Sequence, residues 1–486
     1  MSTSVNRLAA AFAGASLACG CSLAPRYSKP SVVAPTVYKE LPAQVSADGT
    51  VWKQAEPRDA RTRGKWWELF GDIQLDEFED RLSSSNQNVA AAASAFLAAR
   101  AAVAQARSQY FPTIGASPSV TRSHISATPF GASANNSFTE YSLSFDGSWQ
   151  PDFWGKTRNA VAASIFAAQA SAADFENVRL SAHAELAVDY YQLRAQDALE
   201  VLLDSAAAAD REALSLAQTL KTAGLDSDQA VAQAQAQLEA AQAQASNAGI
   251  LRAQYEHAIA TLLGVAASSF TVAVQPFKAP EPAFPLGVPS QLLERRPDIA
   301  AAERAMAQAN AQIGVARAAY FPTIALSASG GYDAFSAASW LTWPSHFWSL
   351  GASGNETLFD GGLRGATVRQ FKAVYDETAA NYRQTVLSAF AQVEDDLASV
   401  RISSEDIHRQ YAAVDAARRN LAEAEARYNA GLTSYLDAVT AQSALIALEQ
   451  VALGFRIQQV VASVRLIEAL GGGWDSTKLP KSKDVK

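Results

Sequence analysis

Few side chains in this 486-residue sequence are placed for covalent or metal chemistry. The five histidines are His124, His183, His257, His346 and His408. They are scattered and lack the close spacing of metal ligands. The sequence contains no phosphate-binding glycine loop and no nucleophile elbow. It therefore predicts neither an enzyme nor a cofactor or metal site.

The two cysteines, Cys19 and Cys21, indicate a different chemistry. Arg7 and an apolar run from Leu8 to Ala18 precede them, which is the layout of a secretory signal peptide. A cysteine after small residues at the end of such a run is a candidate for lipoprotein processing. Cys21 is the better candidate for lipidation because Gly20 precedes it, and Cys19 remains the alternative. An ordinary cleaved signal is less favoured, since no further cysteine is present to form a disulfide.

The compartment and the membrane contact follow from the residues after the signal. Ser22, rather than aspartate, follows Cys21, which fits transfer to the outer membrane of a Gram-negative cell. No later segment has 18 consecutive apolar residues, which argues against a helical membrane span. A chain that crosses a membrane without such helices must cross it as strands. The net charge of −8 and the lack of a basic block argue against binding to nucleic acid.

A tandem duplication organises the rest of the chain. The pentapeptide Tyr-Phe-Pro-Thr-Ile occurs at 110–114 and again at 320–324, an offset of 320 − 110 = 210 residues. Ala223–Leu225 corresponds to Ala430–Leu432, and Leu193-Arg194 to Val400-Arg401, each at an offset of 207. Such a period is longer than that of solenoid repeats, about 20 to 50 residues. Each copy is therefore a domain-sized half of one structure.

The repeated pentapeptide marks a change of secondary structure. Each copy follows an alanine-rich helical run and precedes residues that alternate between small or polar and apolar. Proline lacks the amide donor and disfavours helix in the residue before it. Pro112 and Pro322 are therefore predicted to be the points where a helix passes into a strand.

Two β-hairpins are predicted, at 113–150 and 323–358. Their apolar positions alternate with small or polar ones, a period of two that indicates strands. In the first hairpin these positions are Ile114, Ala116, Pro118, Val120, Tyr141, Leu143, Phe145 and Trp149. Four strands cannot close into a barrel, since bacterial membrane barrels begin at about eight strands. Either several chains share one barrel, or the hairpins pack on a soluble core.

A very long helix is predicted after each hairpin, at about 155–222 and 363–429. Each would extend roughly 100 Å at 1.5 Å per residue and then turn back at Gly224 or Gly431. A further helix is expected to run without a break from Trp66 to Ser108. The C-terminal tail is charged and is expected to be disordered.

These signals divide the chain into six parts. They are a signal peptide at 1–20, an extended leader at 21–65, a first repeat at 66–265, a proline-rich linker at 266–290, a second repeat at 291–470 and a C-terminal tail at 471–486.

With these features, the sequence resembles the outer-membrane channels of tripartite efflux systems, the TolC-like family, and in particular its lipoprotein branch called NodT-type. The resemblance covers nearly the whole mature chain. Its motifs are Cys21–Pro25, Trp66–Asp72, Gly287–Ile299 with Glu303, Ile313–Arg317 leading to Tyr320–Pro322, and Leu470–Trp474. It implies an α+β membrane protein that forms a homotrimer. In it, four strands per chain build one 12-stranded β-barrel, an even number, continued by a long periplasmic α-helical barrel.

The turns between the long helices have both a structural and a functional interpretation. A glycine after a helix can adopt the left-handed conformation, and a serine can cap the returning helix. The resemblance implies that these turns contact the helical hairpin of a periplasmic adaptor protein. The residues concerned are Gly224, Leu225, Ser227, Gly431, Leu432 and Ser434.

Asp437 also has two interpretations. Ser434 and Asp437 have the spacing of a capping box, in which the carboxylate at the third helical position bonds back to the cap. The resemblance implies instead that Asp437 is one of the acidic residues around the closed aperture of the channel. Three copies around one axis would repel one another and attract cations.

We therefore predict a passive exit duct in the outer membrane, lipid-anchored, with a large periplasmic part. An inner-membrane efflux pump would drive it through the periplasmic adaptor, and the substrate is not specified by the sequence. Two alternatives are an exit channel for type I protein secretion and, from another class, a non-conducting structural lipoprotein or adhesin.

Overall fold

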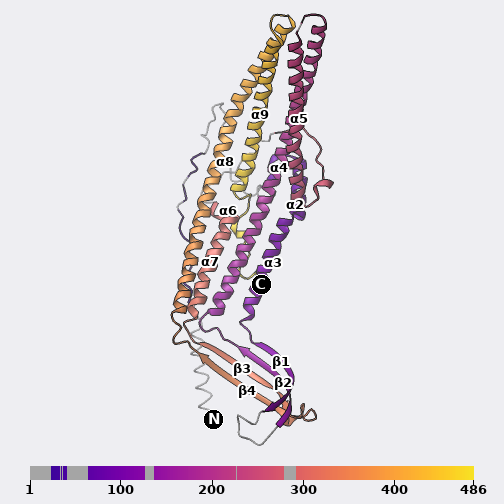
Figure 1. Cartoon of the computed structure of the whole chain (residues 1–486). Helices are drawn as coiled ribbons and strands as arrows, with labels where there is room; N and C mark the ends of the chain where they lie inside the picture. Colours follow the sequence, from indigo (N-terminus) through magenta and orange to yellow (C-terminus); the bar gives the residue numbers. More distant parts are fainter. Residues whose placement is uncertain are drawn as a thin grey trace.

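The computed structural model is a long molecule, with a β-sheet at one end and the turns of two helical hairpins at the other (Figure 1). It describes residues 23–485 apart from 33, 36, 41–63, 126–135, 226 and 279–291. The predicted signal peptide with Cys19 and Cys21 lies outside the described residues. In chain order the elements are η1 (Trp66–Phe70), α2 (Ile73–Ser85), α3 (Gln87–Ser108), β1 (Thr113–Ile125), β2 (Asn136–Trp149), α4 (Lys156–Thr222), α5 (Asp228–Leu262), η2 (Ala267–Ser269), α6 (Leu292–Arg295), α7 (Pro297–Ala318), β3 (Thr323–Ala334), η4 (Trp343–Ser345), β4 (His346–Asn355), α8 (Leu363–Asn429), α9 (Tyr435–Ala469) and η5 (Ser476–Lys478).

The two long helices are present with the predicted bounds. α4 and α8 each contain 67 residues, which corresponds to roughly 100 Å at 1.5 Å per residue. Each begins after a glycine in the left-handed region, Gly155 with φ 77° and Gly362 with φ 92°. α5 returns along α4 and α9 along α8, so that each half of the chain ends in a helical hairpin.

The prediction of one unbroken helix from Trp66 to Ser108 is wrong. The stretch contains the short helix η1 and then α2 and α3, which are separated at Asn86. The Asn86 backbone is extended, with ψ 123°, and its side-chain carbonyl accepts from the Val89 amide, which caps α3. Its side-chain amide donates to the carbonyl of Leu262 at 2.8 Å. The break therefore depends on a contact with the end of α5.

The prediction of a disordered C-terminal tail is also wrong for residues 475–485. Gln169 of α4 donates to the carbonyl of Pro480 at 2.9 Å, and Arg107 of α3 donates to that of Ser482 at 3.3 Å. Val485 is fully buried, and packs with Val103 and Ala168. Apolar contacts to α3 and α4 hold a segment whose charge alone indicated disorder.

The four predicted strands form one antiparallel sheet in the order β1-β2-β3-β4. They contain 13, 14, 12 and 10 residues, which is enough for tilted strands to cross a bilayer. The halves are joined where β2 pairs with β3, with Phe145 opposite Gly330.

The duplication is visible in the packing as well as in the sequence. A side chain at Gly264 would meet the carbonyl oxygen of Ser85 at 2.4 Å, and one at Gly471 would meet that of Arg295 at 2.1 Å. Ser85 and Arg295 are 210 residues apart, and Gly264 and Gly471 are 207 apart. Both glycines have positive φ, so both positions require glycine for the same two reasons. The second helix of each helical hairpin, α5 or α9, therefore ends at the equivalent position in its own half.

The main core lies in a belt partway along the molecule, where η1, α2, α4, α5 and α9 meet. Trp66, Trp67 and Tyr190 are among its buried side chains. His183 stacks on Trp67 at 4.4 Å and bonds to Glu79 at 2.5 Å. Burial lowers the pKa of His183 to about 4, so this histidine is a neutral core residue.

Two helical stretches are long and apolar enough, by length and composition only, to cross a membrane. They are Ile73–Ser108, with mean hydropathy 1.4, and Tyr435–Ala469, with 1.3. This result is compatible with the predicted lack of 18 consecutive apolar residues, because alanine raises the mean hydropathy of a window that also contains polar residues. In the structure α3 lies along α4 and α9 along α8, so both stretches are parts of the helical body.

Gly331 is predicted to be essential for the pairing of β2 with β3. A side chain there would meet the carbonyl oxygen of Leu143 at 1.9 Å, whereas one at the neighbouring Gly330 would meet that of Phe347 at 3.5 Å. We expect Gly331→Ala to reduce the yield of folded protein severely and Gly330→Ala to leave it nearly unchanged. Strand content by circular dichroism and resistance to protease would measure this. Equal behaviour of the two variants would contradict the register.

Candidate functional site

One face of the sheet is mainly polar and the other is mainly apolar. Side chains alternate along each strand, and the pairing aligns the alternation across all four strands. The polar face carries Thr113, Ser117, Ser119, Ser142, Ser144, Asp146, Ser148, Ser327, Ser329, Asp333, Ser349 and Ser353. The apolar face carries Ile114, Ala116, Pro118, Val120, Tyr141, Leu143, Phe145, Trp149, Leu326, Tyr332, Trp348 and Leu350. Such a sheet fits between an apolar surrounding and a wet interior.

The sheet has two edges without a partner among the described residues. β1 pairs only with β2, and β4 only with β3. Exposed edge strands are templates for pairing with another chain. In a hydrocarbon layer each unpaired backbone group is costly, so an open sheet of this kind cannot remain alone.

The predicted junction residues Pro112 and Pro322 stand between helix and strand in both halves. Trp149 donates its indole N–H to the carbonyl of Tyr110 at 3.0 Å. Trp154 stacks on Phe321 at 5.0 Å and donates to the carbonyl of Pro322 at 2.7 Å. The end of the first hairpin and the segment after it therefore fix the helix-to-strand passages of both halves.

The turns at the far end have the same geometry in both halves. The amide of Gly224 donates to the carbonyl of Lys221, and the amide of Leu225 donates to the carbonyl of Leu220, each at 2.9 Å. These are the two hydrogen bonds of a Schellman motif. The amides of Gly431 and Leu432 make the equivalent bonds. Both glycines have φ above 70°.

Leu225 and Leu432 are 76% and 74% exposed. In a Schellman motif a hydrophobic residue at this position often packs back on its own helix. Here the two leucines project from the end of the molecule, so that each turn presents one large apolar side chain.

The capping predictions differ in outcome. Ser227 caps α5, since its hydroxyl accepts from the Ala230 amide at 3.2 Å. Ser434 has the extended backbone of a cap, but its side chain makes no capping bond to α9. The predicted capping box with Asp437 is therefore not formed. Asp437 is exposed in the first turn of α9.

The two hairpins pack against each other just below these turns. Tyr435 is buried with Ala217 and Ala234, so that a side chain of α9 lies against α4 and α5. The Asp210 side chain is fully buried nearby, and burial raises the pKa of its carboxyl.

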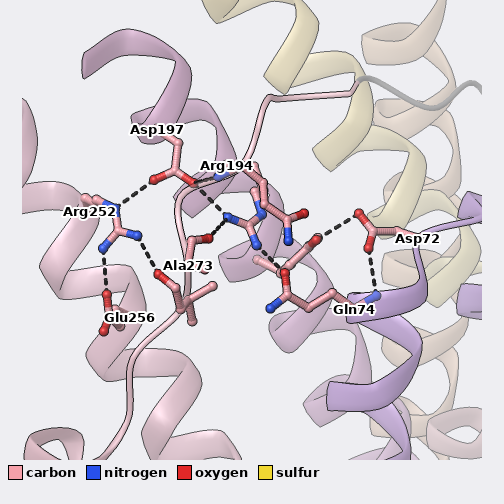
Figure 2. Close-up of polar contacts among 10 residues, drawn as sticks. Asp72, Gln74, Arg194, Asp197, Arg252, Glu256 and Ala273 are labelled. Atoms are coloured by element: carbon pink, nitrogen blue, oxygen red, sulfur yellow. Dashed lines mark hydrogen bonds and ion pairs between the residues drawn. The ribbon is translucent and has the colours of Figure 1, made fainter. Parts of the chain in front are cut away.

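A buried polar network crosses the belt (Figure 2). Asp197 accepts from Arg194 and from Arg252, each at 2.7 Å. Both arginines also donate to the chain after α5, to the carbonyls of Ala273 and Val272 at 2.7 Å. Arg194 donates further to Gln74. The network therefore ties α2, α4, α5 and the beginning of the linker together.

The duplicated arginine pair has different partners in the two halves. Arg194 is nearly fully buried in this network, whereas Arg401 donates to Glu40 of the leader at 2.6 Å. The sequence showed these arginines only as markers of the duplication. Their roles could not be predicted, because the partners lie outside the repeated helices.

Asp189 and Asp396 are a second duplicated pair, 207 residues apart in α4 and α8. Burial, with a contribution from nearby Glu185 and Glu468 respectively, raises the pKa of each carboxyl to about 7. Asp396 lines a cavity of about 460 Å³, together with Arg296 and Arg465. Among the described residues, no three His, Cys, Asp or Glu side chains gather as metal ligands would.

The leader runs along α7 and α8 from the sheet end towards the belt. Arg317, near the end of α7, donates to the carbonyl of Leu23 at 3.2 Å, and Asn310 donates to that of Pro25 at 2.9 Å. Tyr27 bonds to Glu303, about two turns nearer the beginning of α7. Residue 23 is therefore held next to the sheet end of the helical body.

The family model described as outer membrane efflux protein matches residues 80–265 and 288–472. The pyoverdine export outer membrane protein OpmQ of Pseudomonas aeruginosa is 32% identical over 475 residues, which is 95% of this chain and 95% of that protein. The probable efflux pump outer membrane protein TtgC of Pseudomonas putida is 28% identical, over 94% of this chain and 93% of that protein.

Solved structures share the fold over nearly the whole length. The outer-membrane channel OprN has a TM-score of 0.85 at 28% identity, and the match covers 93% of this chain and 100% of that one. The outer membrane channel CmeC of Campylobacter jejuni has a TM-score of 0.88 over 95% and 97% of the two chains. At 22% identity this second likeness shows the fold alone. The described chain therefore has the TolC-like channel fold.

Proposed function

The chain belongs to the outer membrane efflux protein family, and we propose that it is the outer-membrane channel of a tripartite efflux system. The observation that carries the proposal is the open four-stranded sheet, which is apolar on one face and rich in serine on the other. Three copies supply 12 strands, an even number that closes without an edge. The serine face then lines the lumen, and the apolar face contacts lipid.

The helical part places the rest of the duct in the periplasm. Helices of 67 residues extend roughly 100 Å, which is far beyond the hydrocarbon thickness of about 30 Å. The tips are then remote from the outer membrane, where a periplasmic adaptor and an inner-membrane pump can reach them. The family consists of channel and efflux proteins. We propose accordingly that this chain catalyses no reaction.

The cargo is proposed to be drugs or other small molecules that the duct does not itself select. The names of the relatives refer to different cargoes: pyoverdine for OpmQ, and toluene for a TtgC protein of Pseudomonas putida. A family with such varied cargo is consistent with a lumen that does not recognise its contents.

Cys21 is proposed to carry the lipid anchor. Leu23 is held next to the sheet end of α7, and two residues span at most about 7 Å. A lipid attached two residues before Leu23 can therefore reach the membrane surface if the sheet spans the membrane.

We expect Cys21→Ser to abolish incorporation of labelled palmitate. Cys19→Ser is the matched control and should retain the label, because Cys19 leaves with the signal peptide. Label that persists in the Cys21 variant and disappears in the Cys19 variant would move the anchor to Cys19.

The duct is proposed to be closed at its tips by packing between the hairpins, with Asp437 at the aperture. We expect Tyr435→Ala, which removes the buried contact with Ala217 and Ala234, to raise single-channel conductance several-fold in planar bilayers. Tyr411→Ala, at a 41% exposed position of α8, is the control and should behave as wild type. Folded trimers that conduct neither as wild type nor as the Tyr435→Ala variant would refute the duct.

Asp437→Asn should lower the preference of the channel for cations, because it removes the carboxylate from the proposed aperture.

The tip residues Gly224, Leu225, Ser227, Gly431, Leu432 and Ser434 are proposed to contact the adaptor. Leu225→Asp and Leu432→Asp change only exposed side chains, so the fold should persist. Each should weaken adaptor binding by about tenfold, equivalent to about 1.4 kcal/mol, as measured by drug susceptibility and co-purification. Leu251→Asp, at a 45% exposed position of α5, is the control. Unchanged efflux in both tip variants would argue against the contact.

A further inference from the structure

The charged and titratable side chains of the four strands divide by sign between the two faces of the sheet. The acidic residues of the strands all lie on the serine face, and they are Glu140, Asp146 and Asp333. The basic residue Arg122 and the histidines His124 and His346 lie on the apolar face. In the proposed channel this face contacts lipid, so a cation is placed against the membrane. The inference below rests on that proposed function and concerns what the cation binds.

Arg122 and His124 lie at the end of β1 that is remote from the helices. β1 begins at Thr113, shortly after α3, and ends at Ile125, and its pairing with β2 runs without a bulge along this whole length. Arg122 is two residues after Val120, so the two side chains point to the same face. With the helices in the periplasm, this end of the sheet lies in the outer leaflet of the membrane.

The depth of Arg122 in the membrane follows from the length of the strands. Arg122 lies opposite Thr139, and Thr139 is ten residues from Trp149 at the helix end of β2. Ten residues extend about 34 Å along a strand, and a tilt of about 35–45° reduces this to roughly 24 to 28 Å across the membrane. The apolar band of such barrels is about 25 Å tall. With Trp149 at the inner edge of the band, Arg122 lies at its outer edge.

Aromatic side chains mark the same level. Tyr141 lies on the apolar face, two residues inward from Thr139, and Trp340 of the loop after β3 packs against it at 5.7 Å. Trp343 stacks on His346 at 4.2 Å and is 74% exposed. Girdles of aromatic residues lie at the borders of the apolar band in membrane barrels. The side chain of Arg122 is therefore just beyond such a girdle, at the level of the lipid headgroups.

The guanidinium of Arg122 has no acceptor among the described residues. The side chain is exposed and makes no ion pair or hydrogen bond within the described part of the chain. An arginine on the lipid side of a barrel is costly at the bilayer midplane and nearly neutral at the interface. His124 is exposed two residues further along β1, and its Nδ1 bonds to the hydroxyl of Ser137 at 2.9 Å. Its Nε2 is left for a partner outside the described chain.

The charge pattern selects one class of lipid. A guanidinium binds a phosphate through two parallel N–H donors. The outer leaflet of a Gram-negative outer membrane is built mainly from a phosphorylated glycolipid, whose phosphates lie at the border between acyl chains and sugars. At the inner end of the same face the strands carry Ile114, Ala116 and Leu326 and no charged residue. The pattern therefore fits a lipid of the outer leaflet and not one of the inner leaflet.

We propose that Arg122, together with His124, binds a phosphate group of the outer-leaflet glycolipid from the lipid side of the sheet. The guanidinium donates to two phosphate oxygens, and Nε2 of His124 makes a third contact. The acyl chains lie along Pro118 and Val120 on the same face. His346, at the corresponding end of β4, extends the polar border around the sheet.

Lipid binding by the full-length trimer in detergent tests the proposal, with native mass spectrometry to count the bound lipids. The probe is lipid A with both phosphates, and the comparison is the same lipid without phosphates. We expect the wild type to retain the phosphorylated lipid and not the other. Arg122→Gln should weaken this binding about fivefold, which is the effect of one basic residue at an anionic membrane surface. Arg122→Lys keeps the charge and should retain most of the binding.

Arg419→Gln, at an exposed position of α8 far from the sheet, is the matched control and should bind the lipid as wild type does. Phosphatidylglycerol and inorganic phosphate are the competing probes, and displacement of lipid A by either at equal concentration would overturn the assignment to the glycolipid. Unchanged binding by Arg122→Gln, in trimers that still conduct, would overturn the site and leave the channel intact. A protein that forms no conducting channel would overturn the function on which the site depends.

Discussion

Backbone hydrogen bonding in the membrane is the constraint on which the rest of the structure depends. In hydrocarbon no water is present to bond with an N–H or C=O group, so a sheet with open edges cannot persist. This chain provides four strands with edges at β1 and β4. The need to close those edges makes assembly a condition of folding in the membrane.

The helical part meets a different requirement, since it must be long and thin-walled. Alanine lets helices approach closely but contributes little apolar area, so large side chains gather in the belt instead. There, Trp66, Trp67 and the tyrosines of α4 form the main core. Beside this core the two arginines that bond to Asp197 also hold the chain after α5. A buried ion pair adds little net stability by itself, but losing one partner would leave a buried charge. The network therefore fixes where the linker leaves the helices.

The parts that could be predicted from the sequence depend on local signals. Glycines and prolines marked the ends of α4 and α8 and the passages at Pro112 and Pro322, and period-two alternation marked the strands. The parts that could not be predicted depend on distant contacts. Asn86 breaks a helix because it bonds to Leu262, and the C-terminal segment is ordered because Val485 packs on Val103. At the tips, Ser227 and Ser434 are equivalent in sequence, yet only Ser227 caps its helix. The burial of Asp210 has one weak signal in the sequence, because this residue is a single acidic residue after a run of alanines.

The duplication also explains why the halves are alike in scaffold and different in detail. Equivalent close approaches, such as Gly264 on Ser85 and Gly471 on Arg295, preserve the geometry of each half. The segments that cover the helices differ, since the linker bonds to Arg194 and the leader to Arg401. The tips differ as well, because Asp437 corresponds to Ala230 in the first half. In a trimer, six similar hairpins would thus form two alternating sets of three, with Asp437 on one set only. Opening of the proposed aperture would then have threefold rather than sixfold symmetry, because the acidic residue in the first turn of α5, Asp228, is paired with Lys221 and does not take the position of Asp437.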